Sequence, residues 1–367
     1  MEITKTYKYR LRLSKEQMAI IDNHIGICRM VYNLAKETKE YAYASQKINL
    51  SCYDLQKQIT DLKKEFPFIS NVPSQTLQDV IERLDKSYKS FFKGGGYPKW
   101  AKKHKYNSLT FKAVSQVSDY VFKLPKIGNV TIFKDRIIQG ELRLATITKC
   151  NDKYYISIVT KQDKKEQSKA NENQVGIDMG ISFFASLSNG TQIENPRHFL
   201  KAKSKLRVEN RSLARKKKGS NSWLIQKKKL AKLHTKTSAI RQDFLHKNSS
   251  ILVNEFGLIS VEDLKVRNMV KNHKLSNSIY DCGWSMFFDM LEYKSNWNNV
   301  KFVKIDPRYT SQTCNHCGEI DKLSRISQSK FVCTSCGTKS NADINASKNI
   351  LGKGIALIRQ RETGVCA

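Results

Sequence analysis

Two closely spaced pairs of cysteines constrain the fold of this chain more than any other feature of its sequence. Cys314 and Cys317 form one Cys-x-x-Cys pair, Cys333 and Cys336 form the other, and 15 residues separate the two pairs. Each pair presents two thiolates from one tight turn, so the four side chains can supply the tetrahedral ligand set of zinc. Because four cysteines close the coordination shell, we expect a structural Zn²⁺ ion, held in a small ribbon over residues 311–338.

The residues around these pairs leave two alternatives open. A glycine follows each pair, where a tight turn needs a permissive backbone, and His316 could compete as a ligand. The chain has nine cysteines, and an odd number in a protein without secretion signals argues against a disulfide framework. Four unrelated thiols are therefore the alternative to a metal site.

The charge of the chain predicts a polyanionic partner. Its 367 residues include 65 lysines and arginines against 33 acidic residues, which gives a formal net charge of +32. Nucleic acid is the simplest partner for so basic a protein. A membrane is the other, but no apolar run approaches the roughly 20 residues of a spanning helix. The first residues show neither a signal peptide nor a lipidation site, so we expect an intracellular protein that does not bind membranes.

Apolar periodicity predicts an α+β chain of several domains. Residues 3–13 alternate as a strand does, and short β-rich runs return from residue 109 to residue 159, so we expect a small β-barrel over residues 1–13 and 97–160. A helical unit interrupts it over residues 14–96 and ends in a Gly-Gly-Gly-Tyr-Pro turn. Residues 161–174 are polar and without periodicity, as is typical of a linker.

Residues 201–247 form the most basic stretch, with 16 basic residues against two acidic ones. Leucines at helical spacing predict basic helices here. A solvated helical face is the alternative, but solvation alone does not require so strong a bias, and we favour contact with phosphates. The candidates for this contact are Arg211, Arg215, Lys216, Lys217, Lys218, Lys227, Lys228 and Lys229.

Three acidic residues occupy positions where catalytic carboxylates could converge. Asp178 lies at the end of an apolar strand, Glu262 ends another, and Asp343 opens the last predicted helix. Hydrolysis of a phosphodiester by two Mg²⁺ ions needs carboxylates from different elements, which hold the ions roughly 3.5–4 Å apart. Taken singly, each acid could equally be solvated or cap a helix. From the residues alone, the chain is a basic zinc protein and a possible nuclease.

Three segments resemble the split RuvC motifs of the TnpB family, the RNA-guided nucleases encoded by insertion sequences and related to type V CRISPR effectors. They are VGIDMGISFFASLSNG (175–190), ISVEDLKVRN (259–268) and ADINASKNI (342–350). Further segments are similar to this family as well: LPKIG (124–128), RQDFLHK (241–247), SIYDCGW (278–284) and DPRYTSQTCNHC (306–317). Many members have Asp-Arg before the third acid, where this chain has Asn341-Ala342.

The resemblance implies an RNase H-like (RuvC) α/β nuclease domain over residues 175–310 and 339–367, into which the zinc ribbon is inserted. It implies that the β-barrel is wedge-like and that the helical unit serves recognition. Asp178, Glu262 and Asp343 fall on the catalytic positions of the family, where they would bind Mg²⁺. Arg308 precedes the first cysteine pair and could contact the DNA strand that enters the site, although a packing role for this residue is equally consistent with the sequence.

The function implied is that of an RNA-guided DNA endonuclease, which cleaves double-stranded DNA next to a short target-adjacent motif. Its partners would be a guide RNA from the transposon end, with one protein per RNA, and target DNA, in the cytoplasm of a prokaryotic cell and at the nucleoid when bound to DNA. Three rivals remain: an RNA-guided repressor with little or no cleavage, a zinc-ribbon protein that binds DNA without catalysis, and a guide-free RuvC-type nuclease.

Overall fold

The computed structural model describes residues 2–163, 172–272 and 275–363. The chain divides into two compact units, Met1–Lys164 and Lys165–Ala367. Each unit contains a hydrophobic core of its own, so each is stabilised by the burial of its own apolar side chains.

The first unit is built on an antiparallel sheet with the strand order β2-β6-β7-β1-β5-β4-β3. Its strands are β1 (Glu2–Arg12), β2 (Ser108–Phe111), β3 (Ser115–Ser118), β4 (Val121–Leu124), β5 (Gly128–Phe133), β6 (Glu141–Cys150) and β7 (Lys153–Asp163). As expected for a first strand without a neighbour in sequence, β1 pairs with strands from the second half of the unit, β5 and β7. Tyr9 and Leu11 are buried, and Lys8 and Arg10, which alternate with them, are exposed, because successive side chains of a strand point to opposite faces.

The structure corrects the limits of the predicted linker. Strand β7 continues to Asp163, and the next strand, β8, begins at Gln174, so both ends of the range 161–174 belong to strands. Residues 164–171 lie outside the described residues. The extension of β7 follows from its pairing with β1, in which Asp163 lies opposite Glu2.

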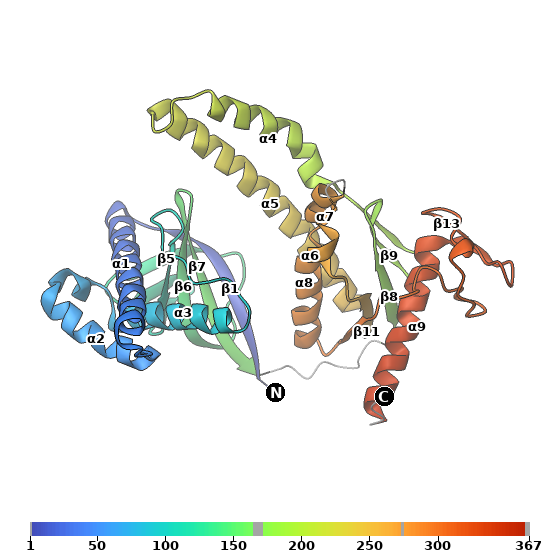
Figure 1. Cartoon of the computed structure of the whole chain (residues 1–367), viewed down its shortest axis with the longest axis horizontal. Coiled ribbons are helices and arrows are strands. Elements are labelled where there is room, and N and C mark those ends of the chain that lie inside the picture. The colour runs from blue at the N-terminus through green and yellow to red at the C-terminus, as the bar shows by residue number, and fades with distance from the viewer. Residues whose placement is uncertain (1, 164–171, 273–274, 364–367) are drawn as a thin grey trace. The chain divides into compact units, whose positions relative to one another are not determined.

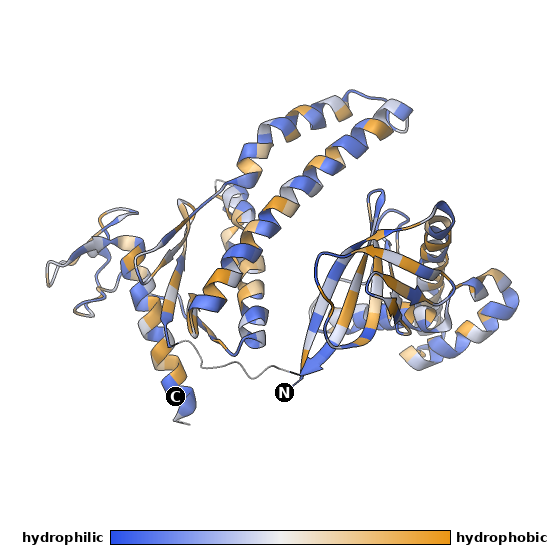
Figure 2. Ribbon diagram, turned by 180° about the vertical axis from the view of Figure 1, so that it is seen from behind, coloured by the Kyte–Doolittle hydropathy of each residue, from blue (hydrophilic) through white to orange (hydrophobic). Residues whose placement is uncertain are grey.

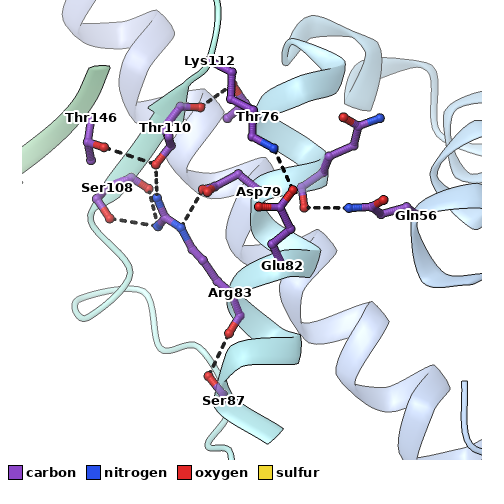
Figure 3. A network of polar contacts seen from close by, with 11 residues as sticks. Gln56, Thr76, Asp79, Glu82, Arg83, Ser87, Ser108, Thr110, Lys112 and Thr146 are labelled. Atoms are coloured by element: carbon purple, nitrogen blue, oxygen red, sulfur yellow. Dashed lines mark hydrogen bonds and ion pairs between the residues drawn. The ribbon is translucent and has the colours of Figure 1, made fainter. Parts of the chain in front are cut away.

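Helices α1 (Lys15–Gln46), α2 (Cys52–Glu65) and α3 (Ser74–Phe92) and the short 3-10 helix Pro67–Asn71 complete the first unit. Ser14 and Gln17 form the capping box expected at the start of α1. Figure 3 shows how α3 is anchored to the sheet. The Arg83 guanidinium pairs with Asp79 at 2.7 Å and donates to the hydroxyls of Ser108 (3.0 Å) and Thr110 (2.7 Å).

The second unit contains a mixed sheet with the strand order β10-β9-β8-β11-β12. The strands are β8 (Gln174–Met179), β9 (Phe183–Leu187), β10 (Gln192–Glu194), β11 (Leu258–Glu262) and β12 (Lys301–Ile305). β8 is parallel to β11, and β11 is parallel to β12, whereas β8–β9 and β9–β10 are antiparallel pairs.

Helices cover both faces of this sheet (Figure 1). On one face, α5 (Asn221–Glu255) and α8 (Trp284–Trp297) contribute to the core, and the short helices α6 (Val266–Met269) and α7 (Ser276–Cys282) lie beside them. On the other face, α9 (Ala342–Glu362) contacts β8 so closely that a Cβ atom at Gly176 would lie 2.1 Å from the carbonyl oxygen of Ser347. The Ser260 hydroxyl of β11 donates to the carbonyl oxygen of Ile350 at 2.9 Å. Glycine and serine on this face therefore let the helix backbone approach the sheet.

Helix α4 (His198–Ala214) and the first half of α5 form a hairpin that projects from the sheet (Figure 1), and many of its residues are hydrophilic (Figure 2). The two helices are joined by polar contacts to the buried side chain of Glu209. Gln226 donates to the Glu209 carboxylate at 2.6 Å, and Lys229 pairs with the same carboxylate at 2.9 Å. One of the only two acids in the basic stretch therefore holds the hairpin together.

The cysteine pairs lie in an irregular segment between β12 and α9. It contains the 3-10 helix Lys322–Ser324 and the antiparallel strands β13 (Lys330–Val332) and β14 (Lys339–Asn341). Because β14 completes this small sheet, the segment extends beyond the expected boundary at residue 338. Among the described residues, no helix is both long and apolar enough to cross a membrane.

Candidate functional site

The structure places Asp178 and Glu262 at the carboxyl ends of the neighbouring parallel strands β8 and β11. The register pairs Ile177 with Val261, so the two acids follow side by side. Side chains two residues apart share one face of a strand. Gly176 and Ser260 face α9, and therefore Asp178 and Glu262 face α9 as well.

Asp343 reaches the same place from α9. It is the second residue of this helix, and the capping side chain of Asn341 accepts from its backbone N–H at 2.9 Å. Ser347, one turn further along, lies against Gly176. The start of α9 therefore lies at the ends of β8 and β11, and the fold brings all three predicted acids together.

Burial and mutual repulsion act on these carboxyl groups. Burial, together with the charges of Glu262 and Asp343, raises the pKa of Asp178 to about 8. Burial also raises the pKa of Glu262 and that of Asp343 above their ordinary values. A cluster of acids whose pKa values are raised in this way is typical of a functional site, because a bound cation would relieve the repulsion.

Two contacts of this cluster were not indicated by the periodicity of the sequence. Arg325, between the two cysteine pairs, donates to the Asp343 carboxylate at 3.1 Å, and its positive charge offsets part of the rise in the pKa of all three acids. The Thr310 hydroxyl donates to the Glu262 carboxylate at 2.5 Å. Both residues come from segments without regular periodicity, so only the folded chain brings them to the acids.

The four paired cysteines form a compact cluster of sulfur atoms. Among the described residues, these four cysteines form a group of candidate metal ligands whose donor atoms all lie within 4.8 Å of one another. The Sγ atoms of Cys314 and Cys336 are 3.8 Å apart, and those of Cys317 and Cys333 are 3.6 Å apart. Tetrahedral zinc with Zn–S bonds of about 2.3 Å separates its sulfurs by about 3.8 Å, so the cluster fits this ion.

The backbone after each cysteine pair has the conformation that the sequence indicated. Gly318 and Gly337 adopt φ angles of +80° and +69°, which residues other than glycine rarely adopt. His316 is exposed and lies outside the sulfur cluster. The four cysteines therefore provide a complete ligand set without the histidine.

Two asparagines join the cysteine segment to the helix that carries Asp343. The Asn345 amide donates to the carbonyl oxygen of Thr313 at 2.7 Å and accepts from the backbone N–H of Asn315 at 3.0 Å. Asn349, one turn later, donates to the carbonyl oxygens of Thr310 and Thr313. The residues Asn345 and Asn349 are four apart and share one helix face, which fixes the first cysteine turn beside the acids.

The predicted phosphate-binding residues lie on the hairpin around its tip, and most of them are exposed. Lys216 is half-buried, and Lys229 is engaged with Glu209. The Lys227 ammonium lies 5.0 Å from the centre of the Trp223 ring. The exposed members are Arg211, Arg215, Lys217, Lys218, Lys227, Lys228 and Lys229. Arg308 is exposed as well and pairs with Asp306 at 3.7 Å.

Comparison with known proteins shows to which family this chain is related. Residues 157–273 match a family model described as a probable transposase, and residues 284–350 match the Cas12f1-like TNB domain. The chain is 32% identical over 381 residues to the putative RNA-guided DNA endonuclease InsQ of Escherichia coli K12, an alignment that covers 98% of this chain and 94% of InsQ. This chain belongs to the TnpB family.

A second relative and one solved structure are similar to this chain over most of its length. A putative RNA-guided DNA endonuclease of Streptomyces pristinaespiralis is 31% identical, with 97% of this chain and 90% of that protein covered. The structure of a Cas12f1–sgRNA–target DNA complex shares the fold, with a TM-score of 0.61 at 13% identity over 95% of this chain and 98% of that one. The fold is thus α+β and multidomain, as in that structure.

One family description differs from the structure of this TnpB-family chain. Residues 1–47 match a model described as a helix-turn-helix domain. In the structure, residues 2–46 contain strand β1 followed by the single helix α1.

Proposed function

We propose that this chain is the RNA-guided DNA endonuclease of an insertion sequence and that it cleaves DNA next to a short target-adjacent motif. The observation that carries the proposal is the convergence of Asp178, Glu262 and Asp343 from three elements on one face of the mixed sheet. The names of the relatives, which are those of putative RNA-guided DNA endonucleases, support the guide RNA and the DNA substrate. We assign the fold around these acids to the RNase H-like (RuvC) class.

The donor set of the three acids fits Mg²⁺, because carboxylate oxygens are the ligands that this ion prefers. When bound, magnesium would supply activation of a water and stabilisation of the leaving oxygen of the phosphodiester, for which we propose a two-metal mechanism. Asp178 and Glu262 hold their carboxylates on rigid strand ends, and Thr310 orients that of Glu262. Arg325 places a positive charge beside Asp343, where it can contact a phosphate group.

The cysteine cluster is proposed to hold one structural Zn²⁺ ion. The ligand set Cys314, Cys317, Cys333 and Cys336 is closed, so this site has a folding role. Through Asn345 and Asn349 the metal-bound turn would position α9 and the segment that carries Arg325.

We infer that the remaining parts bind the nucleic acids. The seven-stranded sheet would be the wedge-like barrel, α1–α3 the helical recognition unit, and the basic hairpin a contact for phosphates. Arg308, in the segment before the first cysteine pair, would contact the DNA strand. Base pairing between guide and target carries sequence specificity in such effectors, while protein contacts to phosphates carry affinity. One protein would bind one RNA.

Reconstitution with its RNA and a plasmid target tests this proposal. Asp178→Ala should abolish cleavage in Mg²⁺ and leave RNA and DNA binding intact. Asp289→Ala removes an exposed acid of α8 and serves as the matched control, which should cleave as the wild type does. Unchanged cleavage by Asp178→Ala would refute the assignment of the site. RNA-dependent DNA binding without cleavage by the wild type would favour the repressor.

A further inference from the structure

The first unit contains a hollow of about 650 Å³ that the proposed catalytic mechanism does not use. It lies where the end of α1, the end of α3 and the following loop meet. Five of its nine lining residues are aromatic, a composition typical of a ligand site. The lining residues are Lys39, Glu40, Tyr43, Ala44, Asn49, Tyr88, Phe91, Phe92 and Tyr97.

Three of these aromatic side chains are exposed. Their exposed fractions are 59% for Tyr43, 76% for Phe92 and 51% for Tyr97. Large aromatic groups that remain in water forgo the stabilisation of burial, and when they gather around a hollow they mark a binding surface. Tyr97 is held edge-on by Phe91, whose ring centre lies 5.2 Å away at an interplanar angle of 83°.

Polar contacts hold two of the aromatic lining residues, Tyr97 and Tyr88, in place. The Glu40 carboxylate accepts from the hydroxyl of Tyr97 at 2.5 Å and from that of Tyr88 at 3.4 Å. Its charge is balanced by Lys36, which is only 2% exposed and whose ammonium also lies 5.2 Å from the centre of the Tyr97 ring. The rings of Tyr97 and Tyr88 are thereby oriented before any ligand arrives, which reduces the entropic cost of binding.

Lysines supply positive charge around the hollow. Lys39 lines it and donates to the Asn49 side chain at 2.9 Å. The Lys47 ammonium lies 5.4 Å from the centre of the Tyr43 ring. An apolar peptide would gain nothing from these charges, whereas a nucleotide would place its base on the aromatic rings and its phosphate near the ammonium groups.

We propose that this hollow binds an unpaired base of a single-stranded nucleic acid. Every base has a π-face, so stacking on Tyr43, Phe92 and Tyr97 tolerates any sequence. The bases of a duplex are already stacked on one another and cannot enter. The inference rests on the proposed function only in that the partner is a nucleic acid, and it requires neither a guide nor cleavage.

Fluorescence anisotropy of the full-length protein tests this site with two labelled probes, an oligothymidylate and a blunt DNA duplex. The double variant Tyr43→Ala/Phe92→Ala should bind the oligothymidylate at least about fivefold more weakly, since stacking of one base contributes roughly 5- to 150-fold. Its affinity for the duplex, and the salt dependence of both affinities, should not change. Tyr41→Ala removes an exposed tyrosine of α1 outside the hollow and is the matched control.

An equal loss on both probes, or no loss on the single strand, would overturn the proposal. Photocrosslinking keeps the test decisive if the basic hairpin dominates binding. An oligothymidylate that carries 5-iodouracil should crosslink to peptides containing Tyr43, Phe92 or Tyr97, and the double variant should lose the crosslinks at the first two positions. Crosslinks confined to the hairpin would contradict the site. Failure of cleavage by the wild type would leave this result unaffected, so the two proposals are tested separately.

Discussion

In the absence of a cation, the fold holds Asp178 largely in its protonated form. Burial and the neighbouring acids raise its pKa to about 8, far above the usual 3.8. Between these two values the folded chain binds a proton that the unfolded chain releases. The contribution of Asp178 to stability therefore falls as the pH rises from about 4 to 8.

Asp178→Asn should consequently stabilise the protein in magnesium-free buffer. Asparagine keeps the shape of the side chain without a charge, so the variant escapes this pH-dependent loss. The Tm of the variant should equal that of the wild type near pH 4 and exceed it increasingly up to pH 8, as measured by differential scanning fluorimetry. A Tm difference that does not vary with pH would contradict the clustering of the acids.

Arg325 acts on the same acids as a competing cation. Its guanidinium forms a half-buried ion pair with Asp343 at 3.1 Å. Because Mg²⁺ would bind the same carboxylate, part of this ion pair would be lost when Mg²⁺ binds. At pH 8.5, where protonation of the acids interferes least, Arg325→Gln should bind Mg²⁺ about fivefold more tightly by calorimetry, the equivalent of about 1 kcal/mol. Lys322→Gln removes an exposed charge of the same segment and should leave the affinity unchanged. Weaker binding by Arg325→Gln would contradict the competition.

At the scale of elements, the close approach of α9 to β8 positions Asp343. A methyl group at Gly176 would lie 2.1 Å from the Ser347 carbonyl oxygen and 2.5 Å from the Leu351 nitrogen, both backbone atoms. Gly176→Ala should therefore lower the free energy of unfolding by at least about 1–3 kcal/mol in urea. Gly352 lies in α9, and no atom lies within 4 Å of the methyl group that Gly352→Ala would add. This control variant should be neutral or stabilising. Equal effects would show that α9 does not pack as described.

We propose that the fold of the cysteine segment depends on a bound metal ion. We predict one zinc per chain in the wild type, and less than one in Cys333→Ser, which removes one of four ligands. Plasma emission spectrometry of the purified proteins measures this ratio. Cys150→Ser changes an exposed cysteine of β6 and should retain the full equivalent. A full zinc equivalent in Cys333→Ser would refute the four-thiolate site.

The basic hairpin should contribute mainly through phosphates. Replacement of Lys217 and Lys218, both exposed near its tip, by glutamine should reduce the slope of log K against log salt on duplex DNA by about 0.9 for each phosphate that the variant no longer neutralises. The decrease in affinity should be similar for unrelated sequences, because phosphates carry no sequence information. A fluorescence titration over a range of salt concentrations checks both expectations. An unchanged slope would place the phosphate-binding residues elsewhere.

Across the whole molecule, features with a local signal were predictable from sequence. The cysteine pairs, the pairing of β1 with later strands and the strand-end positions of Asp178 and Glu262 follow from spacing and period. Strand β3 carries no such signal, because all four of its residues, Ser-Gln-Val-Ser, are exposed and no alternation of burial marks it.

The remaining features arise only when distant segments meet. Arg325 reaches Asp343, and Thr310 reaches Glu262, across loops whose course no periodicity indicates. The aromatic hollow joins residues about 50 positions apart on α1 and α3, whose side chains each resemble ordinary packing residues in the sequence. Tertiary packing, rather than local propensity, creates these sites.

The central claim of the proposed function is that an RNA directs this protein to DNA. The RNA itself provides the most direct test of this claim. The gene would be expressed with its native flanking DNA, the protein purified under conditions that preserve a bound complex, and the copurified RNA sequenced. We predict one discrete RNA that ends in sequence from beyond the transposon end. A heterogeneous mixture of cellular RNA would contradict guided targeting and favour a guide-free nuclease or a simple DNA-binding protein.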